Sequence, residues 1–302
     1  MTANKTHVAA EPETGSNGRD DKGSMIPKYE RIENFTYPEG VRLAVNFTFN
    51  LDAQLLRKLK NEPLMEIPRG EFGGRVGIWR IMDLFDKYDI KLTIFTPGRI
   101  CELYPRALKD AAERGHELEN LTWDKTIPAD IEVEKEHIRK TTEALEKISG
   151  RRPVGTRSGH KLSLLKAEGY IYTCSTMVPD DMPGYISDDG GKNFMLCFPS
   201  SMVLNDAMYF TFGWFGGGNA ANRLADPSKV YDIWLSAFRQ FYKMGGYMNF
   251  ILHPFDTGRS MRVAMLERLI IEMKRCPGVW FPTCEEMACY CINRFSIPSE
   301  VT

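Results

Sequence analysis

The sequence lacks a charge imbalance and lacks a long apolar run. Its 302 residues include 39 Lys and Arg and 40 Asp and Glu, so the formal net charge at pH 7 is -1. This balance provides no basic field for nucleic acid or for an anionic membrane surface. No run of about 18 apolar residues occurs, and no apolar segment follows a basic start. We therefore expect a cytoplasmic protein without a nucleic-acid or membrane partner.

The sequence also lacks a cysteine framework. Seven cysteines is an odd count, and their spacings do not pair off as in small secreted domains. The tightest group, Cys284, Cys289 and Cys291, contains no CxxC pair and lies in a run with the pattern of an amphipathic helix. The cysteines are therefore interpreted as reduced thiols that fulfil core or surface roles.

Apolar residues are scarce in the first 25 residues, which are rich in Gly, Asp, Asn, Thr and Lys. Such a segment buries too little apolar surface to offset the entropy of ordering. We predict a disordered tail over 1–25, a single domain over 26–295 and a short tail over 296–302. No internal repeat and no linker with a shift in composition divides the domain.

From Val41 onward, short β-rich runs alternate with amphipathic helical runs. Strands are expected at 41–49, 91–95, 116–120, 153–157, 169–175, 247–253 and 279–283, and helices at 74–88, 131–150, 227–246 and 260–276. This alternation favours parallel strands joined by crossover helices, and the number of units favours one α/β barrel. The stretch 176–226 is interpreted as elaborated loops.

Polar residues follow the predicted strands at their carboxyl ends. They comprise Asn50 and Asp52, Thr96, the segment Asn120 to Lys125, Arg157, and His253 with Asp256. In a β/α barrel these ends converge on one mouth, where catalysis takes place. Each residue also has a structural interpretation: Asp52 as a turn cap, Arg157 as an ion-pair partner, and His253 as a core histidine.

Other residues near the expected mouth are candidates for substrate contact. The aromatic residues Phe95, Trp123 and Trp214 suit a small apolar ligand, or else pack within the barrel. His160, three residues beyond Arg157, is either a rim residue or a substrate contact. His116 lies at the opposite end of its strand, so a structural role is expected for it.

Several motifs together resemble one known family. The stretch from Arg75 to Asn120, GTRS at 155–158, ILHPFDTGRSMRVAMLERLI at 251–270 and VWFPTCEEMA at 279–288 resemble the polysaccharide deacetylase family. The likeness is to the branch with allantoinase-like and peptidoglycan-deacetylase-like proteins and spans about residues 26–292. It implies a distorted (β/α)7 barrel, similar to a TIM barrel, that hydrolyses amide C–N bonds with a divalent metal.

The resemblance fails at the residues that it implies for the metal. In the family one Asp and two His in an H-x-x-x-H spacing hold the ion, and here Asp52 matches the Asp while Leu121 and Lys125 stand at the His positions. Asn50 stands where the general-base Asp is expected. Leu offers no lone pair and an ammonium repels a cation, so we predict no bound metal and no other cofactor.

Two functional residues of the family are matched: Arg157 at the arginine that orients the base, and His253, in LHPF, at the general acid. The predicted function is a repurposed, metal-independent enzyme that performs acid/base chemistry on a small organic molecule such as a secondary metabolite. Dehydration, cyclisation, isomerisation and C–N or C–C cleavage stay open, as does homo-oligomerisation. The expected catalytic residues are His253, Asp52, Arg157 and Lys125, and the expected substrate-binding residues are Asn50, Phe95, Asn120, Trp123, Asp124, His160 and Trp214.

Two alternatives stay open. One is a catalytically inactive binding protein. The other is a metal-dependent amide hydrolase with a relocated site, for example at Asp52, Asp124 and His253.

Overall fold

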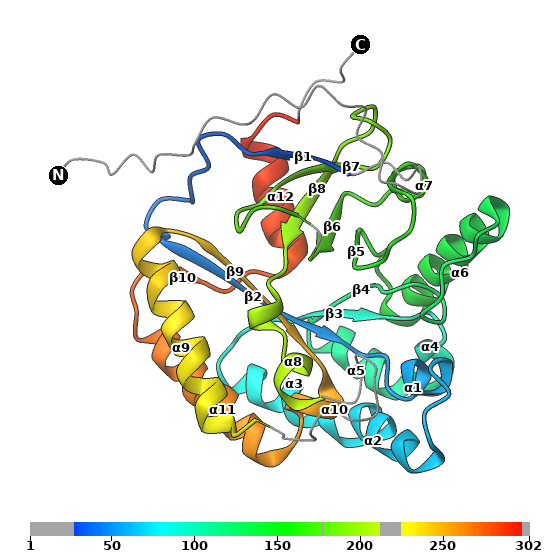
Figure 1. Cartoon of the computed structure of the whole chain (residues 1–302), viewed down its shortest axis with the longest axis horizontal. Helices are drawn as coiled ribbons and strands as arrows, with labels where there is room; N and C mark the ends of the chain where they lie inside the picture. Colours follow the sequence, from blue (N-terminus) through cyan, green and yellow to red (C-terminus); the bar gives the residue numbers. More distant parts are fainter. Residues whose placement is uncertain (1–26, 177, 212–224, 298–302) are drawn as a thin grey trace.

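The computed structural model describes residues 27–176, 178–211 and 225–297. These residues form a single α/β domain in which a curled sheet is surrounded by helices, as Figure 1 shows. The strand order is β1-β7-β8-β6-β5-β4-β3-β2-β10. Strand β9 lies off this path and pairs with β2. The predicted distorted (β/α)7 barrel is confirmed.

Seven parallel strands make up the curled wall. They are β2 (Leu43–Asn50), β3 (Thr93–Thr96), β4 (Glu117–Asn120), β5 (Gly155–Thr156), β6 (Tyr172–Ser175), β8 (Met195–Pro199) and β9 (Tyr247–Leu252). The remaining described strands are β1 (Lys28–Arg31) and β7 (Gly184–Ser187), which extend the edge antiparallel, and the short β10 (Val279–Trp280) beside the start of β2.

Strand β2 illustrates how alternation within a fully buried strand builds the barrel. All eight residues of β2 are buried. Phe47 and Phe49 point outward and pack on Phe85 with ring centroids 4.9 and 5.9 Å away. Successive residues of a strand face opposite sides, so the polar residues Thr48 and Asn50 point into the barrel. Strand β2 therefore contributes apolar packing outside and hydrogen-bonding groups inside.

The barrel is not closed. Strands β8 and β9 are not joined by a ladder, and the described residues there share one isolated bridge, between Asn205 and Ile251. A gap between two strand edges leaves backbone and side-chain groups accessible from the side. We call this region, between β8 and β9, the seam.

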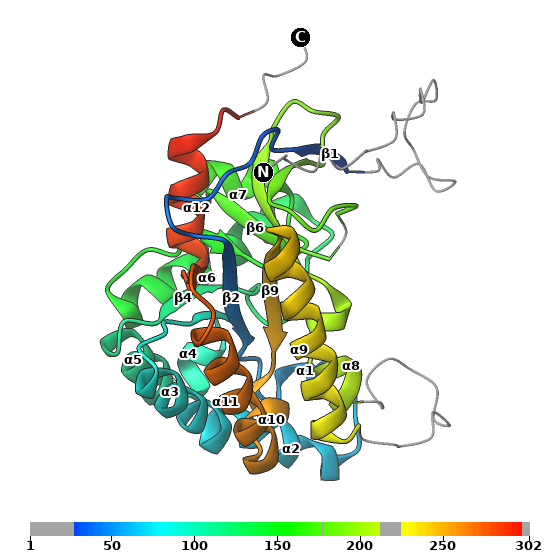
Figure 2. The same ribbon diagram turned by 90° about the vertical axis from the view of Figure 1, so that its left-hand side faces the viewer.

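The longer helices cover the outside of the sheet. They are α3 (Ile78–Lys87), α5 (Pro105–Glu113), α6 (Ile131–Ser149), α9 (Pro227–Met244), α11 (Ser260–Lys274) and α12 (Cys284–Arg294). In Figure 2, α9 and α11 lie side by side, and β2 and β9 point toward the short helix α10 (Pro254–Thr257). The carboxyl ends of the strands therefore lie at the α10 end of the molecule.

Short helices lie mainly in the connections. The α-helices among them are α1 (Leu55–Leu59), α2 (Ile67–Phe72), α4 (Ile100–Leu103), α7 (Leu162–Ala167) and α8 (Ala207–Phe210). Two 3-10 turns, η1 (Leu64–Glu66) and η3 (Met202–Leu204), and the π-helical turn η2 (Gly73–Gly77) accompany them.

Helix ends follow the chemistry of their terminal residues. Helix α6 begins where the Asp130 side chain accepts hydrogen bonds from the amides of Glu132 and Val133. It ends at Gly150, whose φ of 72° is the left-handed conformation that glycine adopts without a steric penalty. The predicted helix over 131–150 is confirmed.

Among the helices in the described residues there is no candidate for a membrane span.

One sequence-based interpretation is wrong. The stretch 176–226 was expected to consist of loops, but it contains strands β7 and β8 and helix α8. Strand β8 is a buried run of five residues, MLCFP, without alternation between polar and apolar residues. A short buried strand of this kind has no periodicity to reveal it. The predicted tails over 1–25 and 296–302 lie largely outside the described residues.

Candidate active site at the carboxyl end of the barrel

Asp52 and Lys125 meet at the mouth of the barrel. Asp52 follows β2, Lys125 follows β4, and Lys125 Nζ lies 3.6 Å from Asp52 Oδ2. Neither carboxylate oxygen of buried Asp52 has a hydrogen-bond partner among the described residues. Burial lowers the pKa of Lys125, the charge of Asp52 opposes this effect, and Arg157 adds to it. The lysine therefore places a cationic group directly beside this carboxylate.

The segment that carries Lys125 has a strained backbone. Thr122 and Lys125 have φ angles of 76° and 74°, in the left-handed region that non-glycine residues rarely adopt. The Asn120 side chain accepts a hydrogen bond of 2.6 Å from the Thr122 amide, and the Thr122 hydroxyl accepts one of 2.7 Å from the Lys125 amide. Such conformations persist where surrounding contacts determine them, and they cluster at functional sites.

His253, at the end of β9, is oriented by Asp206. Its Nδ1 lies 2.6 Å from Asp206 Oδ1, and its backbone amide donates to Asp206 Oδ2 at 2.7 Å. Thr257 Oγ1 also donates to this carboxylate. Because a carboxylate only accepts hydrogen bonds, the Nδ1 atom of His253 carries a proton. The neutral ring therefore has its lone pair on Nε2.

Arg157, after β5, sets the orientation of Asn50. Its guanidinium donates to Asn50 Oδ1 at 2.9 Å and to Thr48 Oγ1 at 2.6 Å. Since Asn50 Oδ1 faces the arginine, the Asn50 amide group faces His253, with Nδ2 lying 3.3 Å from Nε2. A chain of polar contacts thus runs from Arg157 through Asn50 and His253 to Asp206.

Carboxylates around His253 control its charge. Burial disfavours the imidazolium, but the charge of Asp206 and its hydrogen bond, followed by the smaller effects of the Asp52 and Asp256 charges, raise the pKa of His253. Burial and repulsion from Asp206 also raise the pKa of Asp256 to about 6. The ring therefore holds a proton more readily than a free imidazole does.

The structure uses several predicted substrate-binding residues for internal contacts. Phe95 is fully buried, with the guanidinium of Arg157 4.3 Å from its ring centre. Asn120 also donates to the hydroxyl of Tyr170 at 2.9 Å. Trp123 packs so closely on Gly98 that a Cβ there would lie 2.4 Å from the ring. Their roles in binding substrate stay predictions.

The remaining predicted contacts differ in their placement. Asp124 accepts a hydrogen bond of 3.2 Å from the Thr126 amide. His160 is buried with its Nδ1 3.1 Å from Glu134 Oε1, and its Nε2 has no partner among the described residues. Burial lowers the pKa of His160 despite the carboxylate. Trp214 lies outside the described residues.

Asp206 is the functional residue that sequence reasoning missed. It lies in the stretch interpreted as loops, just before α8, and it reaches the site only because β8 and the turn η3 bring the chain back to the mouth. An Asp shortly after a buried strand is the signal that would have revealed it, but strand β8 itself was not recognised.

The residues at the mouth do not fit the divalent metal that the resemblance implies. Leu121 is buried in an apolar cluster that also contains Phe95 and Tyr172. Lys125 Nζ stands near the carboxylate of Asp52. Across the described parts of the chain, no group of three or more His, Cys, Asp and Glu side chains is arranged to hold an ion, and this includes the trio Asp52, Asp124 and His253.

Comparison with known proteins shows which family the domain is similar to. Residues 72–161 match the family model described as polysaccharide deacetylase. A peptidoglycan deacetylase of Helicobacter pylori is 25% identical over 254 residues, which cover 74% of this chain and 86% of the relative. Over residues 72–161 the chain is therefore similar to the polysaccharide deacetylase family. A putative polysaccharide deacetylase of Schizosaccharomyces pombe is also 25% identical, over 85% of this chain and 92% of its own length.

A solved structure shares the fold of the domain. The crystal structure of a putative polysaccharide deacetylase from Mycobacterium smegmatis superposes with a TM-score of 0.80 and 24% identity, covering 91% of this chain and 99% of the other. This likeness establishes the fold. The segment matched by the family model includes Leu121, Lys125 and Arg157, whereas Asp52 and His253 lie outside it.

Proposed function

We propose that this polysaccharide deacetylase-fold protein is a metal-independent enzyme that performs acid/base chemistry on a small organic molecule. The observation that carries the proposal is the position of His253 between Asn50 and Asp206, with Nε2 and Nδ1 each in contact with one of them. An imidazole fixed in one tautomer by a carboxylate is the arrangement that general acid/base catalysis requires.

His253 would begin a reaction cycle as the base. Its Nε2 lone pair accepts a proton from the substrate in place of the long contact with Asn50. Asp206 stabilises the imidazolium that forms, because its carboxylate already accepts a hydrogen bond from Nδ1. The proton then returns to another atom of the substrate. Isomerisation, elimination and C–N cleavage all share this transfer.

Lys125 would stabilise negative charge that develops on the substrate. Its ammonium is mostly buried, and it lies close to Asp52 without a short contact, at 3.6 Å. A cation in a poorly solvated site stabilises an enolate or a tetrahedral oxyanion more strongly than a cation in water does. Asp52 keeps this ammonium charged and in place.

A second candidate is amide hydrolysis, as in the peptidoglycan deacetylase to which the chain is similar. The same residues suit it, since hydrolysis needs an acid for the leaving amine and a donor to the oxyanion. The two candidates differ in their products, because only hydrolysis adds the elements of water across a C–N bond.

The test is a substrate screen with chelator-treated full-length protein. Small amides, cyclic ureides and β-hydroxy carbonyl compounds are incubated with the wild type and with His253→Gln, and the products are identified by mass spectrometry. We expect turnover by the wild type that EDTA does not reduce and that His253→Gln loses. A second variant, His116→Gln, changes a buried histidine at the other end of the barrel and should retain turnover.

Two results would contradict the proposal. Turnover that requires stoichiometric zinc would favour a metal-dependent hydrolase with a site of its own. Turnover unaffected by His253→Gln, with unchanged circular dichroism, would show that this histidine takes no part.

Restoring the two histidines that the family implies tests the metal question directly. The double variant Leu121→His and Lys125→His, together with native Asp52, supplies three ligands at the mouth. We expect this variant to bind one zinc ion with a Kd on the order of micromolar or lower, as designed three-ligand sites can. Isothermal titration measures it, and stoichiometric binding by the wild type with equal affinity would refute our assignment.

A further inference from the structure

The end of the barrel that carries the mouth also carries a group of four arginines. Arg69 lies on α2, Arg80 on α3, Arg259 directly before α11 and Arg262 in its first turn. Helix α10 contacts α2, α3 and α11, and Figure 2 shows these helices gathered at one end of the molecule. The fold therefore brings together side chains that are far apart in the sequence. We call Arg69, Arg80, Arg259 and Arg262 the arginine cluster.

The ring of Phe72 holds two of these guanidinium groups near each other. The central guanidinium carbon of Arg259 lies 3.6 Å from the centre of the ring, and that of Arg80 lies 5.7 Å from it. Each group also donates one long hydrogen bond of 3.4 Å to a backbone carbonyl, Arg259 to Phe255 and Arg80 to Gly258. A guanidinium has several N–H donors in a fixed plane. Most donors of both groups are therefore not used by hydrogen bonds among the described residues.

The other two members of the arginine cluster have carboxylate partners. Arg69 Nη1 lies 2.7 Å from Glu66 Oε2, and Arg262 Nη1 lies 3.1 Å from Oδ1 of buried Asp256. Arg57 also contacts Glu66, at 3.4 Å, but it has a closer carboxylate partner of its own at 2.6 Å. Each of the two carboxylates therefore compensates one arginine of the cluster.

Arg80 and Arg259 form no ion pair with a carboxylate in the described parts of the chain. Arg80 is exposed and Arg259 is half-buried, so both groups are accessible to solvent. Residues 212–224, which lie outside the described ranges, contain no Asp or Glu. Burial lowers the pKa of Arg259, and the charges of the other three arginines add to this effect against the charge of Asp256. The arginine cluster therefore has two uncompensated positive charges in a chain whose net charge is -1.

A phosphate group complements these two charges. A phosphate monoester carries about two negative charges near neutral pH, and its oxygens accept paired N–H bonds from a planar guanidinium. A carboxylate would neutralise only one of the two charges, and a neutral group would neutralise neither. The charge and the donor geometry of the arginine cluster thus favour a dianion over other ligands.

We infer that the arginine cluster is a binding site for a phosphate dianion, either as the ester group of a small organic molecule or as the free ion. Arg80 and Arg259 form the direct contacts, and Arg69 and Arg262 add positive charge beside them. None of the residues assigned above to acid/base chemistry belongs to the cluster, so the inference does not depend on the proposed function.

A matched series of ligands tests the charge preference. Above pH 7, glycerol 3-phosphate, glycerate and glycerol are respectively dianionic, monoanionic and neutral, and inorganic phosphate supplies the free ion. Their binding to the full-length protein is followed by two-dimensional NMR titration. We expect a Kd of about 1 mM for the preferred phosphate, about tenfold weaker binding of glycerate and no measurable binding of glycerol. The tighter of the two phosphates identifies the source of the group.

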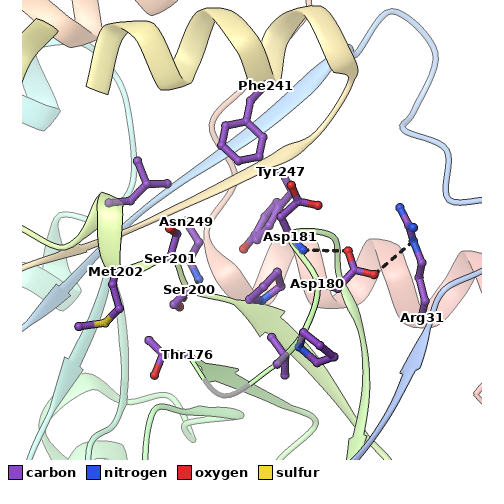
Figure 3. Close-up of a pocket in the computed structure, with 14 residues that line it drawn as sticks. Arg31, Thr176, Asp180, Asp181, Ser200, Ser201, Met202, Phe241, Tyr247 and Asn249 are labelled. Atoms are coloured by element: carbon purple, nitrogen blue, oxygen red, sulfur yellow. Dashed lines mark hydrogen bonds and ion pairs between the residues drawn. The ribbon is translucent and has the colours of Figure 1, made fainter. Parts of the chain in front are cut away.

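Variants then locate the site. Arg80→Gln and Arg259→Gln are each expected to weaken phosphate binding about fivefold, and the double variant to abolish it. Because Arg80 is exposed, its replacement should retain the fold, which circular dichroism checks. Arg31→Gln is the control, since Arg31 is already paired with Asp180 at 3.3 Å beside the seam, as Figure 3 shows. It should leave every affinity unchanged.

Three results would overturn the inference. The first is equal affinity for glycerate and for the two phosphates. The second is wild-type affinity for phosphate in a folded Arg80→Gln or double variant. The third is an equal loss of affinity in Arg31→Gln, which would show that binding depends on the net charge of the protein and not on this site.

Discussion

Two histidines with the same exposure behave oppositely at the two ends of the barrel. His253 at the mouth and His116 at the start of β4 are each 3% exposed. The pKa of His253 is raised, whereas burial lowers the pKa of His116 to about 4 despite the charge of Asp86. Burial alone therefore does not decide the charge of a histidine in this protein.

The difference lies in what each Nδ1 atom contacts. In His253 it faces the Asp206 carboxylate at 2.6 Å, so it carries a proton and the imidazolium is stabilised. In His116 it accepts a hydrogen bond of 3.3 Å from the Leu92 amide, and Asp86 is 3.7 Å from the other nitrogen. Protonating Nδ1 of His116 would place its N–H against the N–H of the Leu92 amide, so that two donors would face each other. The carboxylate contact thus favours the charged ring at the mouth, and the amide contact favours the neutral ring at the other end.

The largest effect on turnover is expected from a change that weakens the contact between His253 and Asp206. Asp206→Asn should lower the pKa of His253, because a neutral amide no longer stabilises the imidazolium. We expect turnover to fall by about 10²- to 10⁴-fold, the range seen for removal of such an orienting carboxylate. Histidine NMR titration measures the pKa and a kinetic assay the rate. An unchanged pKa would mean that Asp206 does not govern this ring.

His116 should make stability depend on pH in the acidic range. Its folded pKa of about 4 lies below the ordinary value of 6.5, so the unfolded chain binds more protons between these values. The contribution of neutral His116 to the free energy of unfolding is complete above pH 6.5. It declines by about 3 kcal/mol as the pH falls to 4. Urea unfolding of the wild type and His116→Gln checks this, and identical pH profiles would contradict it. His253, with a raised pKa, has the opposite sign.

Glu117 and Glu119 on β4 form a carboxyl pair that tests how burial controls charge at the end of the barrel that contains His116. Burial and repulsion from Glu117 raise the pKa of Glu119 well above the ordinary value. The folded state therefore retains a proton that the unfolded chain loses, and stability declines as the pH rises above the ordinary carboxyl pKa. Glu119→Gln should have little effect at pH 4 and stabilise by about 2 kcal/mol at pH 8. Thermal unfolding measures it, with Glu113→Gln as the exposed control.

The smallest effect is expected from a change at Asn50, which contacts the Nε2 atom of His253. In Asn50→Asp the new carboxylate would accept a hydrogen bond from protonated Nε2, where the Asn50 amide now faces the lone pair. The pKa of His253 should rise, and base catalysis near pH 7 should fall roughly tenfold for each unit of that rise. A pH–rate profile checks the direction. A rate at pH 7 equal to or above that of the wild type would argue against His253 as the base.

The sequence predicted most strands of the barrel because short β-rich runs alternate with amphipathic helical runs, and polar residues after those strands predicted the mouth. Asn50, Asp52, Arg157 and His253 were all expected at one mouth, and the structure brings Arg157, Asn50 and His253 into one chain of contacts. Strand β8 and Asp206 were not predicted. A buried run of five residues carries no periodicity, and its neighbours are rich in turn-forming residues.

The sequence by itself determined the residue types at the mouth: Leu121 and Lys125 stand where the resemblance implies two histidines, and Asn50 stands where it implies an aspartate. Local chemistry suffices for this, because neither leucine nor an ammonium coordinates a cation. Only the tertiary structure decided which partner each retained residue has. The pairing of His253 with Asp206, 47 residues away, and the opening of the seam depend on how strands separated in sequence are placed side by side. No local pattern encodes such a contact.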